Sequence, residues 1–188
     1  MPHHSTTRLD PRAPLVLDTR QLPRQAGAMR TVVRVIPAPQ DLGLALIGVP
    51  EGTDLSLDLR MEWVGEGVLV SGQVSGRLAG ECARCLRVID TNLEVAIQEL
   101  FASPDSITDV TTEEDEVGRL QDDLIDLEPT VRDAVVLALP SSPLCRADCP
   151  GLCPGCGAHW DDLPAGHHHE EQVDPCWAAL KNLRLTEE

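Results

Sequence analysis

The chain has 188 residues, a formal net charge of −16 at pH 7, and only one phenylalanine and three tryptophans as aromatic residues. This length suits one domain, or one domain with a small appendage, and suffices to bury a core built from Val, Leu, Ile and Ala. Phosphate backbones repel so acidic a protein, so naked nucleic acid is a poor partner and a basic protein is a more natural one.

The first thirty residues lack the continuous apolar segment of a signal peptide, since Asp10, Asp18 and several arginines interrupt them. No window of the sequence approaches the length of a transmembrane helix. We therefore expect a cytoplasmic protein with no membrane contact. Thiols stay reduced in that compartment, which favours metal binding over disulfides.

The first part of the chain is predicted to be rich in β-structure. Residues 1–13 are expected to be a flexible leader, and residues 14–103 a β-rich domain that carries the first cysteine pair. Pro14–Leu22 alternates loosely and is a candidate strand, and Thr31–Ile36 is β-branched and is a second one. The short apolar run Leu44–Val49 lies among prolines and glycines, and its state is left open.

The clearest pattern in the chain predicts a β-hairpin between Leu55 and Leu78. Apolar and polar residues alternate on both sides of a turn at Gly65–Gly67. The pair Cys82 and Cys85 follows directly, and Val88–Phe101 then alternates again as a long strand. The first hundred residues are therefore expected to form an antiparallel sheet or an open barrel.

The second part of the chain is predicted to be an acidic linker followed by helices. Residues 104–123 are rich in carboxylates and poor in apolar residues. The apolar period then becomes helical over Asp126–Leu139, with Asp126 as the expected cap, and a second helix is expected over Pro175–Leu185. Residues 124–188 are thus a helical and zinc-binding region, and the predicted fold class is α+β with two short helices.

Six of the seven cysteines lie in closely spaced groups. GECARCL holds Cys82 and Cys85, and LCRADCPGLCPGCGAHW, from Leu144 to Trp160, holds four more. Two cysteines separated by two residues can curl around one metal ion, and proline and glycine suit such a turn. Two C-x-x-C pairs in one chain indicate tetrahedral zinc, and the alternative is a disulfide framework or plain buried cysteines.

Two arrangements of the eight candidate zinc ligands stay open. A two-site arrangement groups them in two sets of four: Cys82, Cys85, Cys145 and Cys149; and Cys153, Cys156, His167 and His169. A single zinc ribbon would instead set Cys82–Cys85 opposite Cys153–Cys156 and leave Cys145 and Cys149 spare. The histidines have a second interpretation as a solvated loop, and Cys176 is expected to be a spare thiol.

The sequence contains no GxGxxG, P-loop, GxSxG or HExxH motif, and His159 has no neighbours that would complete a triad. We therefore expect a protein that is not an enzyme. The alternative from another class is a thiol-disulfide oxidoreductase that uses one C-x-x-C pair. Such enzymes place the pair at the start of a helix, whereas here CARC lies between strands and CPGCG lies in a loop. A zinc-ribbon transcription adaptor would require a basic or aromatic face, and the sequence shows no such face.

Taken in order, these features resemble the YceD-like family, named for large ribosomal RNA subunit accumulation. The resemblance covers roughly residues 14 to 185. It is carried by CARCL, a strand ending in QELF, an acidic stretch, DLIDLEPTVRDAVVLALPSSPLC, CPGLCPGCG and a terminal DPxWAAL-type segment. Family members tend to have a C-x-C pair where His167 and His169 stand, and an arginine where Cys176 stands. The first departure keeps zinc ligands, and the second removes any contact that depends on the arginine.

The resemblance implies a bacterial or plastid factor needed for normal accumulation of 23S rRNA, without enzymatic activity. The family's gene often accompanies that of a small protein of the large ribosomal subunit. The predicted function is therefore a zinc-stabilised acidic binding module in large-subunit biogenesis. Its expected partner is a basic ribosomal protein or a large-subunit assembly intermediate, and direct contact with RNA is left open.

Overall fold

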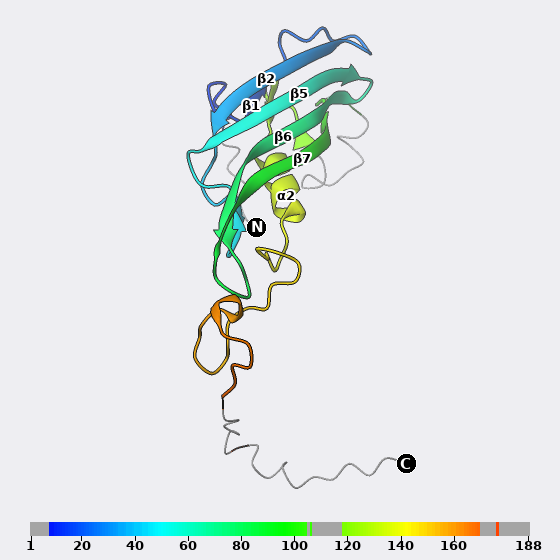
Figure 1. Cartoon of the computed structure of the whole chain (residues 1–188). Helices are drawn as coiled ribbons and strands as arrows, with labels where there is room; N and C mark the ends of the chain where they lie inside the picture. The colour runs from blue at the N-terminus through cyan, green and yellow to red at the C-terminus, as the bar shows by residue number, and fades with distance from the viewer. Residues whose placement is uncertain (1–7, 105, 107–117, 170–175, 177–188) are drawn as a thin grey trace, which may run out of the picture.

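A curved antiparallel sheet forms the body of the molecule in the computed structural model, which describes residues 8–104, 106, 118–169 and 176 (Figure 1). Its four main strands lie side by side in the order β2 (Met29–Pro37), β5 (Asp54–Val64), β6 (Gly67–Glu81) and β7 (Val88–Ala102). In the described chain β2 and β7 are not paired with each other, so the sheet stays open.

The predicted hairpin is confirmed as β5 and β6, whose register runs from Val64 opposite Gly67 to Leu55 opposite Gly76. Along β5, buried and exposed residues alternate, and the buried set is Leu55, Leu57, Leu59 and Met61. Because side chains of a strand point alternately to its two faces, this alternation places one face on the core and the other in solvent.

Short strands extend the body at its margins. They are β1 (Val16–Asp18), β3 (Gly43–Leu44), β4 (Ile47–Gly48), β8 (Gly118–Arg119) and β9 (Leu124–Asp126). The unassigned run Leu44–Val49 supplies β4 of the β3–β4 hairpin, which pairs with β6 near Gly80. β1 pairs with β9, which the sequence did not predict, and thus ties the start of the described chain to the segment before the helix.

The helix α2 (Glu128–Ala138) packs against β7 and β3. Its Val131 and Val135 are fully buried, as the helical period predicted. The helix begins at Glu128 rather than at Asp126, but the Asp126 carboxylate accepts a hydrogen bond from the Glu128 N–H at 3.0 Å. One of the otherwise unpaired N–H groups of the first turn is satisfied in this way.

The main hydrophobic core is a cluster whose members run in sequence from Leu15 to Leu139. Its members are aliphatic side chains and Met61, with Phe101 as the one aromatic side chain among the buried residues. The expected aliphatic core is therefore confirmed, and α2 shares this core with the sheet.

The predicted α+β fold with two short helices is wrong. The described chain is mostly antiparallel sheet, and α2 is its only α-helix, accompanied by a 3-10 turn, η1 (Trp160–Asp162). The alternating patterns of β6 and β7 each continue for 15 residues, so the sheet outweighs the 11-residue helix. The second predicted helix, Pro175–Leu185, lies outside the described residues except for Cys176.

The predicted leader and acidic linker lie partly outside the described residues, and the domain boundaries stay predictions. Within the described ranges, no helix combines the length and the apolar character that a membrane span needs.

Replacing Leu57 by alanine tests the assignment of the core. Leu57 is 1% exposed, so Leu57→Ala should lower the free energy of unfolding by about 2–5 kcal/mol, measured by urea denaturation. The adjacent Ser56→Ala is the control, because Ser56 is exposed and its replacement should change stability by less than about 0.5 kcal/mol. Equal effects of the two substitutions would contradict the described face of β5.

Candidate metal centre

The pair Cys82 and Cys85 lies in a tight turn where the chain passes from β6 to β7, at the end of the sheet remote from β2 (Figure 1). Two backbone hydrogen bonds close the turn. The Cys82 N–H donates to the Arg87 carbonyl at 2.9 Å, and the Leu86 N–H donates to the Cys82 carbonyl at 2.9 Å. Because β6 and β7 are long and fully paired up to Glu81 and Val88, they hold this turn in a fixed place.

The pair Cys153 and Cys156 folds into the same turn. The Cys153 N–H donates to the Ala158 carbonyl at 2.7 Å, and the Gly157 N–H donates to the Cys153 carbonyl at 2.8 Å. In both turns, the hydrogen-bonded N–H and carbonyl groups are separated by the same numbers of residues. Two separate C-x-x-C segments thus adopt one backbone geometry, which we call the first knuckle (residues 82–87) and the second knuckle (residues 153–158).

The residue after the second cysteine of each knuckle has left-handed backbone geometry. In the second knuckle this is Gly157, with φ of 74°, and in the first knuckle it is Leu86, with φ of 61°. The other non-glycine residues with positive φ in the described chain are Asp41, Asp122 and Asp123, of a type that tolerates this region. A leucine there costs roughly 1–2 kcal/mol, so the first knuckle carries a strain that the second avoids.

Cys145 and Cys149 join the first knuckle from the segment after α2, where the Ala83 N–H donates to the Pro143 carbonyl at 2.8 Å. The four sulfurs of Cys82, Cys85, Cys145 and Cys149 then lie within 4.8 Å of one another. The Sγ atoms of Cys82 and Cys149 are 3.8 Å apart, and those of Cys85 and Cys145 are 3.6 Å apart. These distances match the edge of about 3.8 Å of a tetrahedron with Zn–S bonds of about 2.3 Å.

The thiols of this first group differ in their affinity for protons. Burial raises the pKa of the Cys82 thiol, but hydrogen bonds from backbone groups, Cys145 first among them, outweigh burial and lower its pKa to about 6. Burial, together with hydrogen bonds to the neighbouring thiols, raises the pKa of Cys145 to about 12. Only part of the group can therefore ionise by itself, because like charges at this distance repel one another. A cation at the centre would remove that penalty.

The second knuckle gathers a second group of four, Cys153, Cys156, His167 and His169, whose ligand atoms also lie within 4.8 Å of one another. The His167 Nε2 atom is 3.5 Å from the Cys153 sulfur, 3.6 Å from the Cys156 sulfur and 2.9 Å from the His169 Nε2 atom. The two nitrogen-to-sulfur distances match a tetrahedral edge of about 3.6 Å for zinc with one nitrogen and one sulfur ligand.

Gly155 makes room for the histidines of this group. A Cβ atom at this position would lie 2.4 Å from the Cδ2 atom of His169, closer than side chains approach one another. The first glycine of CPGCG, Gly155, thus has a steric role: it leaves space for the His169 ring. The Trp160 ring packs edge-on against His167, with ring centroids 5.8 Å apart, and helps to orient the imidazole.

The structure thus brings all eight candidate ligands into two groups of four. The first knuckle does not face the second as a single ribbon requires, and Cys145 and Cys149 are not left over. None of the seven cysteines is in a disulfide, and Cys176 is exposed and lies outside both groups. Binding of a metal by these residues stays a prediction.

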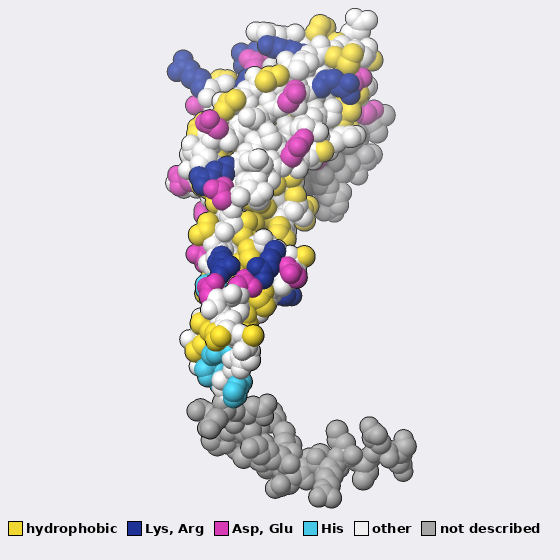
Figure 2. All heavy atoms as spheres, in the orientation of Figure 1, with side chains coloured by type: hydrophobic (Ala, Val, Ile, Leu, Met, Phe, Trp, Pro, Cys, Tyr) yellow, Lys and Arg dark blue, Asp and Glu magenta, His cyan; other side chains and the backbone are white. Residues whose placement is uncertain are grey.

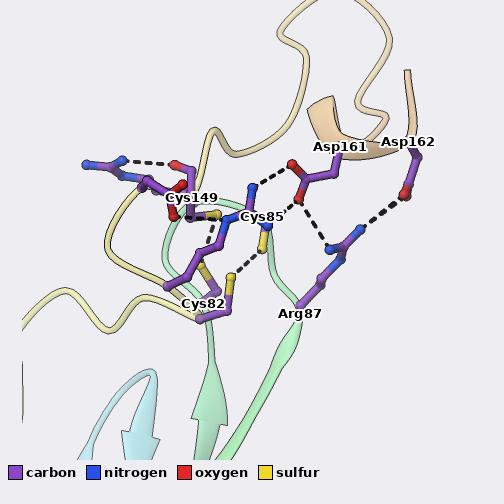
Figure 3. A network of polar contacts seen from close by, with 10 residues as sticks. Cys82, Cys85, Arg87, Cys149, Asp161 and Asp162 are labelled. Atoms are coloured by element: carbon purple, nitrogen blue, oxygen red, sulfur yellow. Dashed lines mark hydrogen bonds and ion pairs between the residues drawn. The ribbon is translucent and has the colours of Figure 1, made fainter. Parts of the chain in front are cut away.

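An arginine–aspartate network, which the sequence did not reveal, links the two groups. Arg146 donates to both carboxylate oxygens of Asp161, at 2.8 and 2.6 Å. Arg87 reaches Asp161 at 3.4 Å and Asp162 at 3.2 Å, and Figure 3 shows these contacts beside Cys85. Arginines within and next to the cysteines of the first group, and the aspartates after the second knuckle, were the only signal in the sequence, and spacing alone could not identify which of them pair.

The network draws on three parts of the cysteine region. Arg87 ends the first knuckle, Arg146 lies between Cys145 and Cys149, and the two aspartates lie in η1, just after the second knuckle. A bidentate arginine–carboxylate pair is among the stronger charged contacts, because two hydrogen bonds fix its geometry. The position of one group is therefore coupled to that of the other.

The sequence of residues 70–184 matches the family described as "Large ribosomal RNA subunit accumulation protein YceD". The chain belongs to this family. It is also 51% identical over 181 residues to the uncharacterized protein Rv2926c of Mycobacterium tuberculosis, a match that covers 96% of the chain and 86% of the relative. The uncharacterized protein ML1660 of Mycobacterium leprae is 43% identical over 171 residues, covering 91% and 78%.

A more distant relative is the uncharacterized protein YlbN of Bacillus subtilis, which is 31% identical over 113 residues, 58% of the chain and 62% of the relative. No solved structure matches the chain. The segment that matches the family contains both cysteine groups and the whole arginine–aspartate network.

Asp161→Asn tests whether the network couples the two groups. Loss of the charge should speed amide exchange across both residues 82–87 and residues 153–162, measured by hydrogen-exchange mass spectrometry. Asp148→Asn is the control, because the Asp148 carboxylate is 85% exposed and meets Arg146 through a single oxygen. Faster exchange around the second knuckle alone would contradict the coupling.

The same contact predicts a pH dependence. The Arg146 guanidinium lowers the pKa of Asp161 below its usual value. The contact therefore stabilises the fold above the ordinary aspartate pKa of about 4, and the stabilisation is lost as the pH falls further. The gap in exchange rate between wild type and Asp161→Asn should close in that acid range.

Proposed function

We propose that this protein is a non-enzymatic, cytoplasmic factor in large ribosomal subunit biogenesis that supports accumulation of 23S rRNA. The observation that carries the proposal is membership of a family described by large ribosomal RNA subunit accumulation. The matched segment spans the cysteine region rather than the sheet alone, which supports a functional role for that region.

In this proposal each group of four holds one zinc ion as a structural cross-link. Thiolate and imidazole ligands in tetrahedral sets of four are the donors that structural zinc sites use, and a closed set leaves no open position for catalysis. The bound metal would neutralise the thiolates. The chain's own residues orient the ligands, through the backbone hydrogen bonds of the two knuckles and the Arg146–Asp161 contact.

The acidic character of the chain supports a basic partner. With a net charge of −16, the surface attracts a basic ribosomal protein or an assembly intermediate that exposes one, and it disfavours bare phosphate. The proposed mechanism is non-covalent: the protein holds such a partner near the maturing rRNA.

A thiol-disulfide oxidoreductase is less well supported. Its attacking thiol would need access to solvent at the start of a helix. Cys82 is 0% exposed and Cys85 is 3% exposed, and the first knuckle joins two strands. A lowered thiol pKa is typical both of a metal ligand and of a nucleophile, so the pKa of Cys82 does not favour the oxidoreductase.

The function can be tested by complementation in a strain that lacks the gene. The deletion should lower the ratio of large-subunit to small-subunit rRNA, and the wild-type chain should restore it. A double variant, Cys82→Ser with Cys149→Ser, should fail, because its first group can no longer hold a metal. Cys176→Ser is the matched control, since this cysteine lies outside both groups, and it should restore the ratio.

An unchanged rRNA ratio in the deletion strain would overturn the proposed function. Full restoration by the double variant would overturn only the role of the first metal group. The abundance of each variant is measured by quantitative immunoblotting, so that loss of protein is distinguished from loss of activity.

Salt dependence tests the electrostatic part of the proposal. Co-sedimentation of the protein with large-subunit precursors should weaken as salt rises from about 0.1 M to about 1 M, where the Debye length falls from roughly 10 to 3 Å. Association that survives unchanged at the higher salt would argue against a contact dominated by charge.

A further inference from the structure

Apolar side chains are exposed at the first knuckle and the strand that follows it. Leu86 is 58% exposed and Val88 is 77% exposed, although the preceding cysteines Cys82 and Cys85 are buried. In Figure 2, hydrophobic side chains gather on the narrow part of the molecule that joins the sheet to the cysteine groups. Packing within the described chain thus gives no reason for leucine and valine at these two positions.

The backbone of Leu86 makes its exposure more informative. The equivalent position of the second knuckle is Gly157, so the turn itself requires no side chain there. Leucine is unfavourable at this position for two reasons: its backbone is left-handed, and its apolar side chain is exposed to solvent. Strained residues of this kind concentrate where they contact a ligand or a partner.

A carboxylate lies next to this apolar pair. Glu81 is directly opposite Val88 in the β6–β7 register, so their side chains share one face of the sheet. On its other side the Glu81 N–H donates to the Leu46 carbonyl at 2.9 Å, which places the partly exposed Leu46 beside it. Within the described residues, the Glu81 carboxylate has no ion pair or hydrogen bond.

A groove adjoins these residues. It has a volume of about 410 Å³, shares Leu46 and Glu81 with the group above, and is otherwise lined mainly by apolar residues, among them Leu44, Pro50 and Ala79. Gly80 lets β4 approach β6 closely, because a Cβ atom there would lie 2.3 Å from the Leu46 carbonyl oxygen. The groove therefore reaches Glu81, whose partner across the β6–β7 ladder is Val88.

We propose that Leu46, Glu81, Leu86 and Val88, which we call the knuckle surface, form the docking site for a basic protein of the large ribosomal subunit. This inference rests on the proposed function and names the surface that it would use. The leucines and the valine would bury apolar side chains of the partner, and Glu81 would pair with one of its lysines or arginines.

The charges around the knuckle surface favour a protein over RNA. The nearby arginines are already engaged: Arg84 donates to the Cys149 carbonyl at 2.9 Å, and Arg87 and Arg146 hold the aspartates of η1. The Arg84 guanidinium has no carboxylate beside it among the described residues, but the Glu81 carboxylate, also without a partner among them, and the net charge of −16 disfavour phosphate. An apolar surface with one unpaired carboxylate complements a protein surface that carries basic side chains.

The test compares three full-length chains: wild type, Leu86→Gly with Val88→Ser, and Leu137→Ser. Leu86→Gly installs the residue that the second knuckle already uses, so the turn and its metal content should be preserved. Leu137 is 84% exposed on α2 and is the matched control for loss of an exposed leucine. Each chain is immobilised and presented with proteins extracted from purified large ribosomal subunits, and the retained proteins are quantified by mass spectrometry.

We expect wild type and Leu137→Ser to retain the same basic protein, and the double variant to retain it about tenfold less. Metal content should be equal in all three chains, and the double variant should unfold at no lower temperature than wild type, because Leu86→Gly relieves the left-handed strain. If Val88→Ser disturbs the strand, the single variant Leu86→Gly decides the question. Equal retention by all chains, or no retained basic protein, would overturn the inference, as would a preference for naked rRNA over the protein fraction.

Complementation separates this inference from the proposed function. If the deletion lowers the rRNA ratio but Leu86→Gly restores it fully, the knuckle surface is wrong and the proposed function stands. If the deletion leaves the ratio unchanged, the proposed function fails, while the retention experiment still decides whether the surface binds a basic protein.

Discussion

The cysteine region depends on its donor groups, because it has almost no apolar core of its own. The last member of the main core in the sequence is Leu139. The cysteine region has a separate, small buried cluster, which consists of Cys82, Cys85 and Cys149 with a few partly buried apolar neighbours. So few buried side chains cannot offset the conformational entropy of ordering the thirty residues that follow α2. Two metal cross-links would add on the order of 10 kcal/mol each, as structural zinc does in small modules.

The sheet and the donor groups depend on each other through the β6–β7 hairpin. Two 15-residue strands, paired along their whole length, carry the first knuckle away from the core and present it to the segment after α2. The Arg87–Asp161–Arg146 contacts then tie η1, which follows the second knuckle, to the first cysteine group. Leu86 lies in a turn that two backbone hydrogen bonds close between paired strands, so a partner would meet a surface formed in advance, which lowers the cost of binding.

Local patterns in the sequence predicted much of this arrangement. Alternation from Leu55 to Leu78 is a property of neighbouring residues and gave the hairpin, and the C-x-x-C spacing gave both knuckles. Contacts between residues far apart in the sequence could not be predicted from local patterns. Nothing local indicates that Val16 lies opposite Asp126, or that Arg146 contacts Asp161. The α+β assignment was wrong because the described chain has one 11-residue α-helix beside a sheet in which β6 and β7 each run for 15 residues. The left-handed geometry of Leu86 became visible only by comparison with Gly157.

The central claim is that two groups of four ligands each hold a metal ion and thereby organise the region after α2. It is tested most directly by the zinc content per chain of protein purified without chelator, measured by elemental mass spectrometry while reactive thiols are counted in parallel. The account predicts two zinc ions per chain, with Cys176 the readily reactive thiol. Protein without metal, or with one zinc ion and several reactive thiols, would contradict it.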